Sequence, residues 1–144
     1  MALRIAIGGD HAGFEHKQFI LKYLQEKNYG TSDFGPYTTE SMDYPDSTHP
    51  LAAAVENKEF DFGILICGSG NGVCMTANKH QGIRAGLVWN EDVVKLIRQH
   101  NDANIMCIPA RFVSKEEALE FVKLFLSTDF EGGRHANRAA KIPC

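Results

Sequence analysis

The segment CGSGNGVCMTANKH, residues 67 to 80, places a thiol at the mouth of a glycine-rich loop. Cys67 ends the apolar run FGILIC, and three glycines alternate with polar residues directly after it. Glycines at a strand-to-helix turn leave backbone N–H groups free to bind an anion, and such donors favour a thiolate. The loop lacks both the glycine spacing of a dinucleotide-binding turn and the GK[ST] ending of a P-loop. We interpret it as a tight anion-binding turn, although a simple chain reversal beside an inert, buried cysteine fits the same residues.

Basic side chains elsewhere could hold a phosphate. Arg134 and Arg138 lie four residues apart behind a glycine pair, so a short helix would present both guanidinium groups on one face. Two planar guanidinium forks suit a phosphate dianion. A solvated basic helix face is the competing interpretation of this tail.

Five short apolar runs predict strands that position these groups. They are residues 3–8, 29–35, 62–68, 84–89 and 104–110. Segments with helical periodicity lie between them, and Ser114 with Glu117 forms a capping-box pattern that predicts the start of a further helix. Strands as continuously apolar as FGILIC are typical of a parallel sheet covered on both faces. The fold class predicted is α/β, a three-layer, doubly wound, Rossmann-like sandwich around a five-stranded parallel sheet.

Ligands bind beyond the carboxyl ends of the strands in such sheets. Asp10 and His11 follow the first strand, Cys67 ends the third, and Arg111 follows the fifth, so we expect them along one edge. His100 precedes the fifth strand, and the chain topology therefore predicts that it lies toward the opposite edge of its own subunit.

Composition sets limits on the function. The chain has 144 residues and a formal net charge of −3, which suits one domain over residues 1–144 and gives no general attraction to nucleic acid or anionic membrane. The N-terminal apolar stretch is too short for a signal peptide, and four cysteines without CxxC spacing indicate reduced thiols, so we expect a cytoplasmic protein. Residues 35–50 are expected to form a long surface loop, and residues 130–142 a basic C-terminal segment.

Seven motifs occur in order along nearly the whole chain: GGDHAG, DYP, ICGSGNG, ANK, GIRA, HNDAN and EGGRHANR. Together they resemble the type B ribose-5-phosphate isomerases, a family that also includes galactose-6-phosphate isomerase subunits. The resemblance covers about residue 3 to residue 142. It implies an aldose–ketose isomerase of the pentose phosphate pathway that acts on a sugar phosphate, uses no metal or other cofactor, and is built as a Rossmann-like homodimer.

The resemblance also implies roles for individual residues. Cys67 would be the base that moves a proton between C2 and C1, whereas some family members carry a glutamate at the position of Val73, which cannot accept a proton. His100, with Asp10 as a polar partner, would open the sugar ring. The loop residues would stabilise the enediolate, with the Ser69 hydroxyl also able to shuttle a proton; they are Gly68, Ser69, Gly70, Asn71 and Gly72. Tyr44 and Asn101 would line the sugar, and the phosphate would be held by His11, Arg111, Arg134 and Arg138.

If His100 lies off the ligand edge of its own subunit, it can reach a site only across a subunit interface. A two-fold symmetric dimer would then make two equal sites. Two other functions remain open from the sequence. One is isomerisation of a hexose 6-phosphate, such as allose or galactose 6-phosphate, and the other is a non-catalytic sugar-phosphate-binding module, which would not need Cys67 together with His100.

Overall fold

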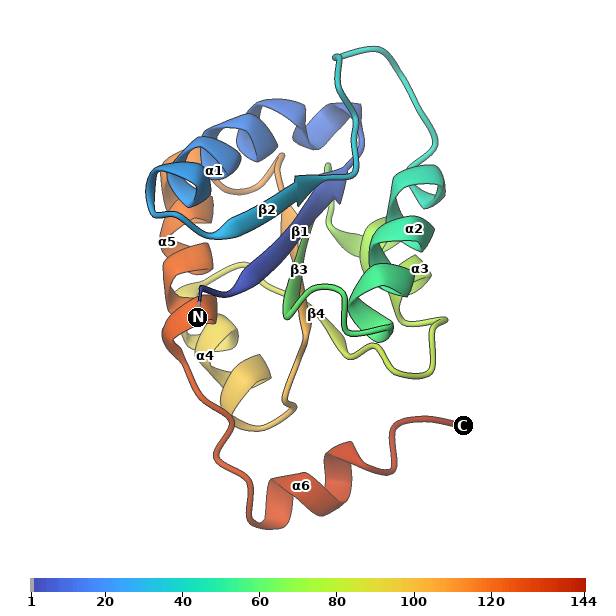
Figure 1. Ribbon diagram of the computed structural model, residues 1–144, viewed down its shortest axis with the longest axis vertical. Helices are drawn as coiled ribbons and strands as arrows, with labels where there is room; N and C mark the ends of the chain where they lie inside the picture. Colours follow the sequence, from blue (N-terminus) through green and yellow to red (C-terminus); the bar gives the residue numbers. More distant parts are fainter. Residues whose placement is uncertain (1) are drawn as a thin grey trace.

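The computed structural model describes residues 2–144, in which strands and helices alternate (Figure 1). The strands are β1 (Arg4–Gly9), β2 (Gly30–Asp33), β3 (Phe62–Cys67), β4 (Ala85–Leu87) and β5 (Ile105–Pro109). The helices are α1 (Phe14–Glu26), preceded by the 3-10 turn η1 (His11–Gly13), then α2 (Pro45–Glu56), α3 (Asn71–Ala77), α4 (Glu91–Gln99), α5 (Lys115–Ser127) and α6 (Arg134–Ala139). Each strand lies within an apolar run predicted from the sequence, except that β1 extends one residue beyond its run.

The strands form one parallel sheet in the order β2-β1-β3-β5-β4. This confirms the predicted α/β fold. The chain leaves β1 for β2 on one side and continues with β3 on the other, so the direction of winding reverses between β1 and β3. At such a reversal the loops that follow the two strands separate to opposite faces and leave a crevice at their carboxyl ends. The turn after β1 and the Cys67 loop after β3 border this crevice.

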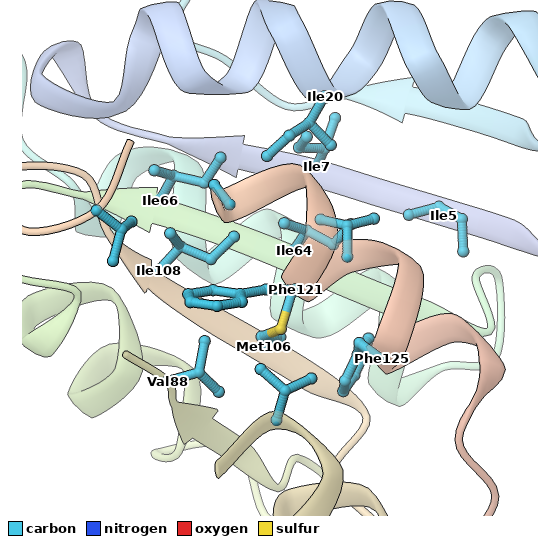
Figure 2. Packing of buried hydrophobic residues seen from close by; sticks show 14 of the residues in the cluster. Ile5, Ile7, Ile20, Ile64, Ile66, Val88, Met106, Ile108, Phe121 and Phe125 are labelled. Atoms are coloured by element: carbon cyan, nitrogen blue, oxygen red, sulfur yellow. The ribbon is translucent and has the colours of Figure 1, made fainter. Parts of the chain in front are cut away.

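Helices cover both faces of the sheet because alternate strand residues point to opposite sides. On one face Ile7, Ile64 and Met106 pack with residues of α1, α4 and α5. Figure 2 shows Phe121 and Phe125 of α5 packed against this face. On the other face, residues of α2 and α3 pack with a second buried cluster that contains Ala6, Leu65, Cys67, Ile105 and Cys107.

Helix starts follow the capping signals of the sequence. Ser114 accepts a hydrogen bond from the Glu117 N–H and its own N–H donates to the Glu117 carboxylate, which confirms the predicted capping box. Asn90 caps α4 by accepting a hydrogen bond from the Val93 N–H at 2.9 Å. These caps fix where α5 and α4 begin.

The prediction of a loop over residues 35–50 is wrong for its last third. The irregular segment ends at Tyr44, and α2 begins at Pro45. Proline is well placed at a first helical position, because its missing N–H would have no intrahelical partner there. Pro50 inside the helix removes one hydrogen bond, but the helix continues as Leu51 and Ala52 pack into the core with no exposed surface.

A buried ion pair ties α1 to the end of β2. The Lys17 side chain is fully buried, and its Nζ lies 2.6 Å from Asp33 Oδ2. The second carboxylate oxygen of Asp33 accepts a hydrogen bond from the Gly35 N–H, and the Tyr37 hydroxyl donates to the Asp33 carbonyl. Lys17 therefore anchors the start of the segment that leads to Tyr44. In residues 2–144 no helix combines the length and the apolar character that a membrane span requires.

Candidate active site

The turns that follow β1 and β3 are in direct backbone contact. The Asp10 N–H donates to the Ile66 carbonyl at 3.2 Å, and a Cβ on Gly9 would lie 1.9 Å from that same oxygen. Only glycine allows the two strand ends to approach this closely. The GGDHAG motif thus brings Asp10 and His11 beside the Cys67 loop.

Cys67 is the last residue of β3, and only 4% of its surface is exposed. Its carbonyl accepts a hydrogen bond from the Ala110 N–H, which ties it to the end of β5. The chain then turns through Gly70 in the left-handed region, with φ at 75°, and enters α3. Ser69 stabilises the turn, because its hydroxyl oxygen accepts a hydrogen bond from the Asn71 N–H at 3.2 Å.

Two side chains from other elements lie over the glycines of this loop. A Cβ on Gly68 would lie 3.1 Å from Cζ of the Arg111 guanidinium, and a Cβ on Gly72 would lie 2.5 Å from Cζ of the Tyr44 ring. The Arg111 N–H also donates to the Gly68 carbonyl. The loop therefore carries a cation on one side and a phenol on the other, close enough to contact a ligand bound over the glycines.

Asp10 and His11 complete this group. Asp10 is 8% exposed, and its carboxylate caps η1 by accepting a hydrogen bond from the Ala12 N–H. The Met42 N–H donates to Nδ1 of His11 at 3.2 Å. A neutral His11 ring must then carry its proton on Nε2, which leaves an N–H donor for an anion.

The remaining predicted site residues lie at the opposite edge of the sheet. His100 follows the last residue of α4, just before the chain enters β5, and Figure 1 shows α6 beyond the amino ends of the strands. The Glu131 N–H donates to the Gln99 carbonyl, which joins the segment before α6 to the end of α4. A cavity of about 330 Å³ there is lined by His100, Asn101, His135, Arg138, Ala139 and Ile142.

Arg134 and Arg138 are both on α6, as their spacing predicted, and both are exposed. The helix follows Gly132 and Gly133, whose φ angles of 70° and 56° lie in the left-handed region. Within one chain this helix does not cover the Cys67 loop. It lies at the other edge because α5 returns the chain to the amino ends of the strands before α6 begins.

The structure thus divides the candidate residues into two sets. The carboxyl-edge set comprises Asp10, His11, Tyr44, Cys67, Gly68, Ser69, Gly70, Asn71, Gly72 and Arg111. The amino-edge set comprises His100, Asn101, Arg134 and Arg138. The two edges are separated by the length of β3, on the order of 17–20 Å for a six-residue strand. No side chain spans that distance.

Sequence reasoning missed two residues beside His100. The His135 ring stacks on the His100 ring with centroids 4.1 Å apart, and the Glu131 carboxylate lies near both imidazoles. Both residues are in the EGGRHANR motif, which drew attention only for its arginines. Their spacing of four residues was a signal that one helical turn would bring them together.

Comparisons with known proteins show the family of this chain. The family model described as Ribose/Galactose Isomerase matches residues 5–142. A probable ribose-5-phosphate isomerase B of Mycoplasma pneumoniae is 45% identical over 96% of this chain and 91% of its own length. The ribose-5-phosphate isomerase B of Escherichia coli is 41% identical over 96% of this chain and 93% of its own length.

Solved structures of this family are also similar to this chain in fold and sequence. A ribose 5-phosphate isomerase of Thermotoga maritima superposes with a TM-score of 0.96 at 44% identity, covering 99% of both chains. The ribose-5-phosphate isomerase B of Mycoplasma genitalium, solved with bound ribulose-5-phosphate, has a TM-score of 0.93 at 44% identity and covers 99% of this chain and 95% of its own. With the family model matched over almost the entire chain, this protein belongs to the ribose/galactose isomerase family.

Proposed function

We propose that this protein interconverts D-ribose 5-phosphate and D-ribulose 5-phosphate in the non-oxidative pentose phosphate pathway. One observation carries the proposal: a relative solved with ribulose-5-phosphate shares 44% of its residues over 99% of this chain. The chain also retains a buried thiol beside a glycine loop, which fits a reaction that moves a proton and develops an anion. A cytoplasmic location and a single isomerase domain over residues 1–144 are parts of the same proposal.

Cys67 is the proposed base. As a thiolate it removes the proton from C2 of the open-chain aldose, the C–H electrons form the C1=C2 bond, and negative charge moves onto O1. A proton then moves from O2 to O1, the C2=O2 bond forms, and the C1=C2 electrons take the thiol proton at C1 to give the ketose. Val73 supports this assignment because it is fully buried and carries no group that could replace Cys67.

The glycine loop stabilises the enediolate in this scheme. Its N–H groups are fixed by the strand-to-helix turn, so they need no rearrangement as charge develops on the sugar oxygens. The Ser69 hydroxyl can both donate and accept a proton, which suits a transfer between O1 and O2. Tyr44 lies over Gly72 and would bound the sugar on that side.

The complete site requires two subunits in this proposal. His100, the group for ring opening, and Asn101 lie at the opposite edge from Cys67 and Asp10 in one chain. A homodimer with two-fold symmetry would set the amino edge of each subunit against the carboxyl edge of its partner and form two equal sites. Arg134 and Arg138 would then come from the same subunit as His100.

The phosphate would be bound from both sides of this interface. His11, through Nε2–H, and Arg111 would approach it from the subunit that supplies Cys67. Arg134 and Arg138 would approach it from the partner, and none of the ion pairs within residues 2–144 engages either guanidinium. Exposed, unpaired arginines on a short helix are suited to such a contact.

A direct assay tests the proposed substrate. Ribose 5-phosphate, allose 6-phosphate and galactose 6-phosphate would be compared at matched concentrations, and we expect kcat/KM for ribose 5-phosphate to be at least tenfold higher. The family model includes galactose isomerases, so preference for a hexose 6-phosphate is the main alternative. A hexose preference would overturn the substrate assignment, and absence of turnover on all three would indicate a binding module instead.

A further inference from the structure

Three potential metal ligands meet where α4 ends and α6 begins. His100, Glu131 and His135 each offer one ligand atom, and these atoms lie within 4.8 Å of one another. Oε1 of Glu131 lies 3.9 Å from Nε2 of His100 and 3.7 Å from Nε2 of His135. Both distances are too long for hydrogen bonds, so the three polar atoms do not satisfy one another.

His135 provides a second and independent observation. The residue is only 7% exposed, and its Nε2 is buried without a hydrogen-bond partner in the described residues 2–144. Buried polar atoms are nearly always paired, so an orphan facing a carboxylate and another imidazole indicates an absent ligand.

The backbone holds the three residues in place. The His100 N–H donates to the Leu96 carbonyl at 2.9 Å, and the Glu131 N–H donates to the Gln99 carbonyl at 3.1 Å. The His135 N–H donates to the Gly132 carbonyl within the turn that opens α6. Ligands on fixed backbone lose less freedom when they close on an ion.

Two imidazoles and one carboxylate are a donor set that Zn²⁺ binds, with a fourth position left for water. In a tetrahedral site with bonds of about 2.0–2.1 Å, ligand atoms lie roughly 3.3–3.4 Å apart. The nitrogen–oxygen distances of 3.7 and 3.9 Å would therefore have to shorten by about half an ångström. The two rings, now stacked at 11°, would tilt so that both lone pairs point at the ion. The positive charges of Arg134 and Arg138 nearby would weaken the binding of a cation here.

We propose that His100, Glu131 and His135 form an inhibitory site for a divalent transition metal, with Zn²⁺ the best match. The ion would occupy Nε2 of His100 and so withdraw that imidazole from ring opening. Metal binding does not depend on the function proposed above, whereas the inhibition rests on it. The metal in this proposal regulates the enzyme and takes no part in the reaction.

Direct binding tests the site without reference to activity. Chelator-treated protein would be titrated with Co²⁺, whose visible absorption reports four-coordinate binding, and then with Zn²⁺ to displace it. We expect one Co²⁺ per chain and at least a tenfold weaker affinity in Glu131→Gln, since even indirect partners of a metal ligand change affinity by about 10–100-fold. Glu131 is exposed, so this variant should fold.

His80→Gln is the matched control. His80 is also an imidazole near a carboxylate, with Nδ1 lying 3.5 Å from Glu56, but its other nitrogen lies 2.9 Å from a nitrogen of His49. That variant should bind Co²⁺ as the wild type does. Absence of Co²⁺ binding, or equal affinity in wild type and Glu131→Gln, would overturn the proposed site.

Inhibition is measured separately, with ribose 5-phosphate as substrate. Glu131→Gln should keep its metal-free activity to within a few-fold and need at least ten times more Zn²⁺ for half-inhibition. Equal sensitivity of the two proteins would place the inhibitory ion elsewhere, for example on the Cys67 thiolate, and would overturn the inhibitory role. Failure of the proposed function is distinguishable, because metal would bind as expected while the metal-free wild type showed no isomerisation.

Discussion

The two edges of the sheet hold candidate residues in very different surroundings. At the carboxyl edge Cys67 and Asp10 are almost completely buried, and they sit on strand ends joined by backbone hydrogen bonds. At the amino edge Arg134 and Arg138 are exposed on a six-residue helix behind a glycine pair. The difference suggests a division of labour between an edge built for proton transfer, which needs a dry and rigid site, and an edge built to meet a partner and an anion.

Cys67→Ala should have the largest effect on kcat. It removes the proposed base at the carboxyl edge and leaves the amino edge unchanged. Loss of a general acid–base group typically lowers kcat by about 10²–10⁴-fold, and substrate binding should persist because the phosphate contacts remain. Turnover would be followed together with equilibrium binding of ribose 5-phosphate. Cys107→Ala is the control: Cys107 lies in the same buried cluster, and burial raises its pKa well above the usual value, so it should have no catalytic part. Near-normal turnover of Cys67→Ala would contradict the assignment of Cys67 as the base.

Arg134→Ala tests the amino edge. A charge-assisted hydrogen bond contributes roughly 1.5–3 kcal/mol, so kcat/KM for ribose 5-phosphate should fall by about ten- to a hundredfold. Arg138→Ala should behave similarly, and Arg134→Lys should recover only part of the loss, because an ammonium lacks the planar fork. Free ribose is the reference substrate. If slow turnover of free ribose fell equally, the arginines would serve folding or assembly instead of the phosphate.

Asp33→Asn should lower the free energy of unfolding and affect the carboxyl edge more than the amino edge. The change leaves the fully buried Lys17 ammonium without its counter-charge. A buried pair broken on one side typically costs 3–5 kcal/mol, and we expect about 2 kcal/mol here because Asp33 keeps some solvent exposure. The anchored segment carries Tyr44 and Met42 to the carboxyl edge, so that edge should loosen while Co²⁺ binding at the amino edge persists.

Asp61→Asn is the comparison for this stability measurement. Asp61 pairs with Arg4 at 3.4 Å, but half of the arginine side chain is exposed. Exposed pairs contribute about 0–1 kcal/mol, so chemical unfolding should show a much smaller change. Equal losses in the two variants would mean that burial of Lys17 does not matter.

The smallest expected effect is a pH dependence of the free energy of unfolding that arises at the amino edge. Burial, followed by the charges of His100, Arg134 and Arg138, lowers the pKa of His135 in the folded state, against the opposing effect of the Glu131 carboxylate. The unfolded chain then binds a proton near pH 6.5 that the folded chain does not, so this contribution to stability falls as the pH drops from about 7. Urea unfolding at pH 7.5 and 5.5 would measure the dependence. It should be weaker in His135→Gln, and an unchanged dependence would contradict the assigned cause.

Much of the fold could be predicted because its signals are local. The apolar runs located all five strands, and Ser114 with Glu117 located the start of α5. The start of α2 was missed because residues 45–50, PDSTHP, have a loop-like composition, while the packing of Leu51 and Ala52 that stabilises the helix is a tertiary effect. Lys17 was missed for the same reason, since its partner lies 16 residues away on another element.

The candidate site could be predicted in part. Residues at strand ends, such as Cys67 and Asp10, follow from topology, because parallel strands end at one edge. The edge at which α6 lies follows from topology too, because α5 returns the chain to the amino ends of the strands. Its contact with the end of α4 does not, since the segment between α5 and α6 has no periodicity that fixes its direction. The grouping of His100 with Glu131 and His135 depends on that direction, and so it became visible only in the structure.

The central claim is that each complete site combines Cys67 of one subunit with His100 of another. Mixing inactive Cys67→Ala and His100→Ala proteins under conditions of subunit exchange tests it most directly. Random exchange makes half of the dimers mixed, each with one intact site, so activity should recover to roughly a quarter of the wild-type value. If mass spectrometry confirms mixed dimers and the activity stays at the level of the separate variants, the two residues do not act across an interface and the account is wrong.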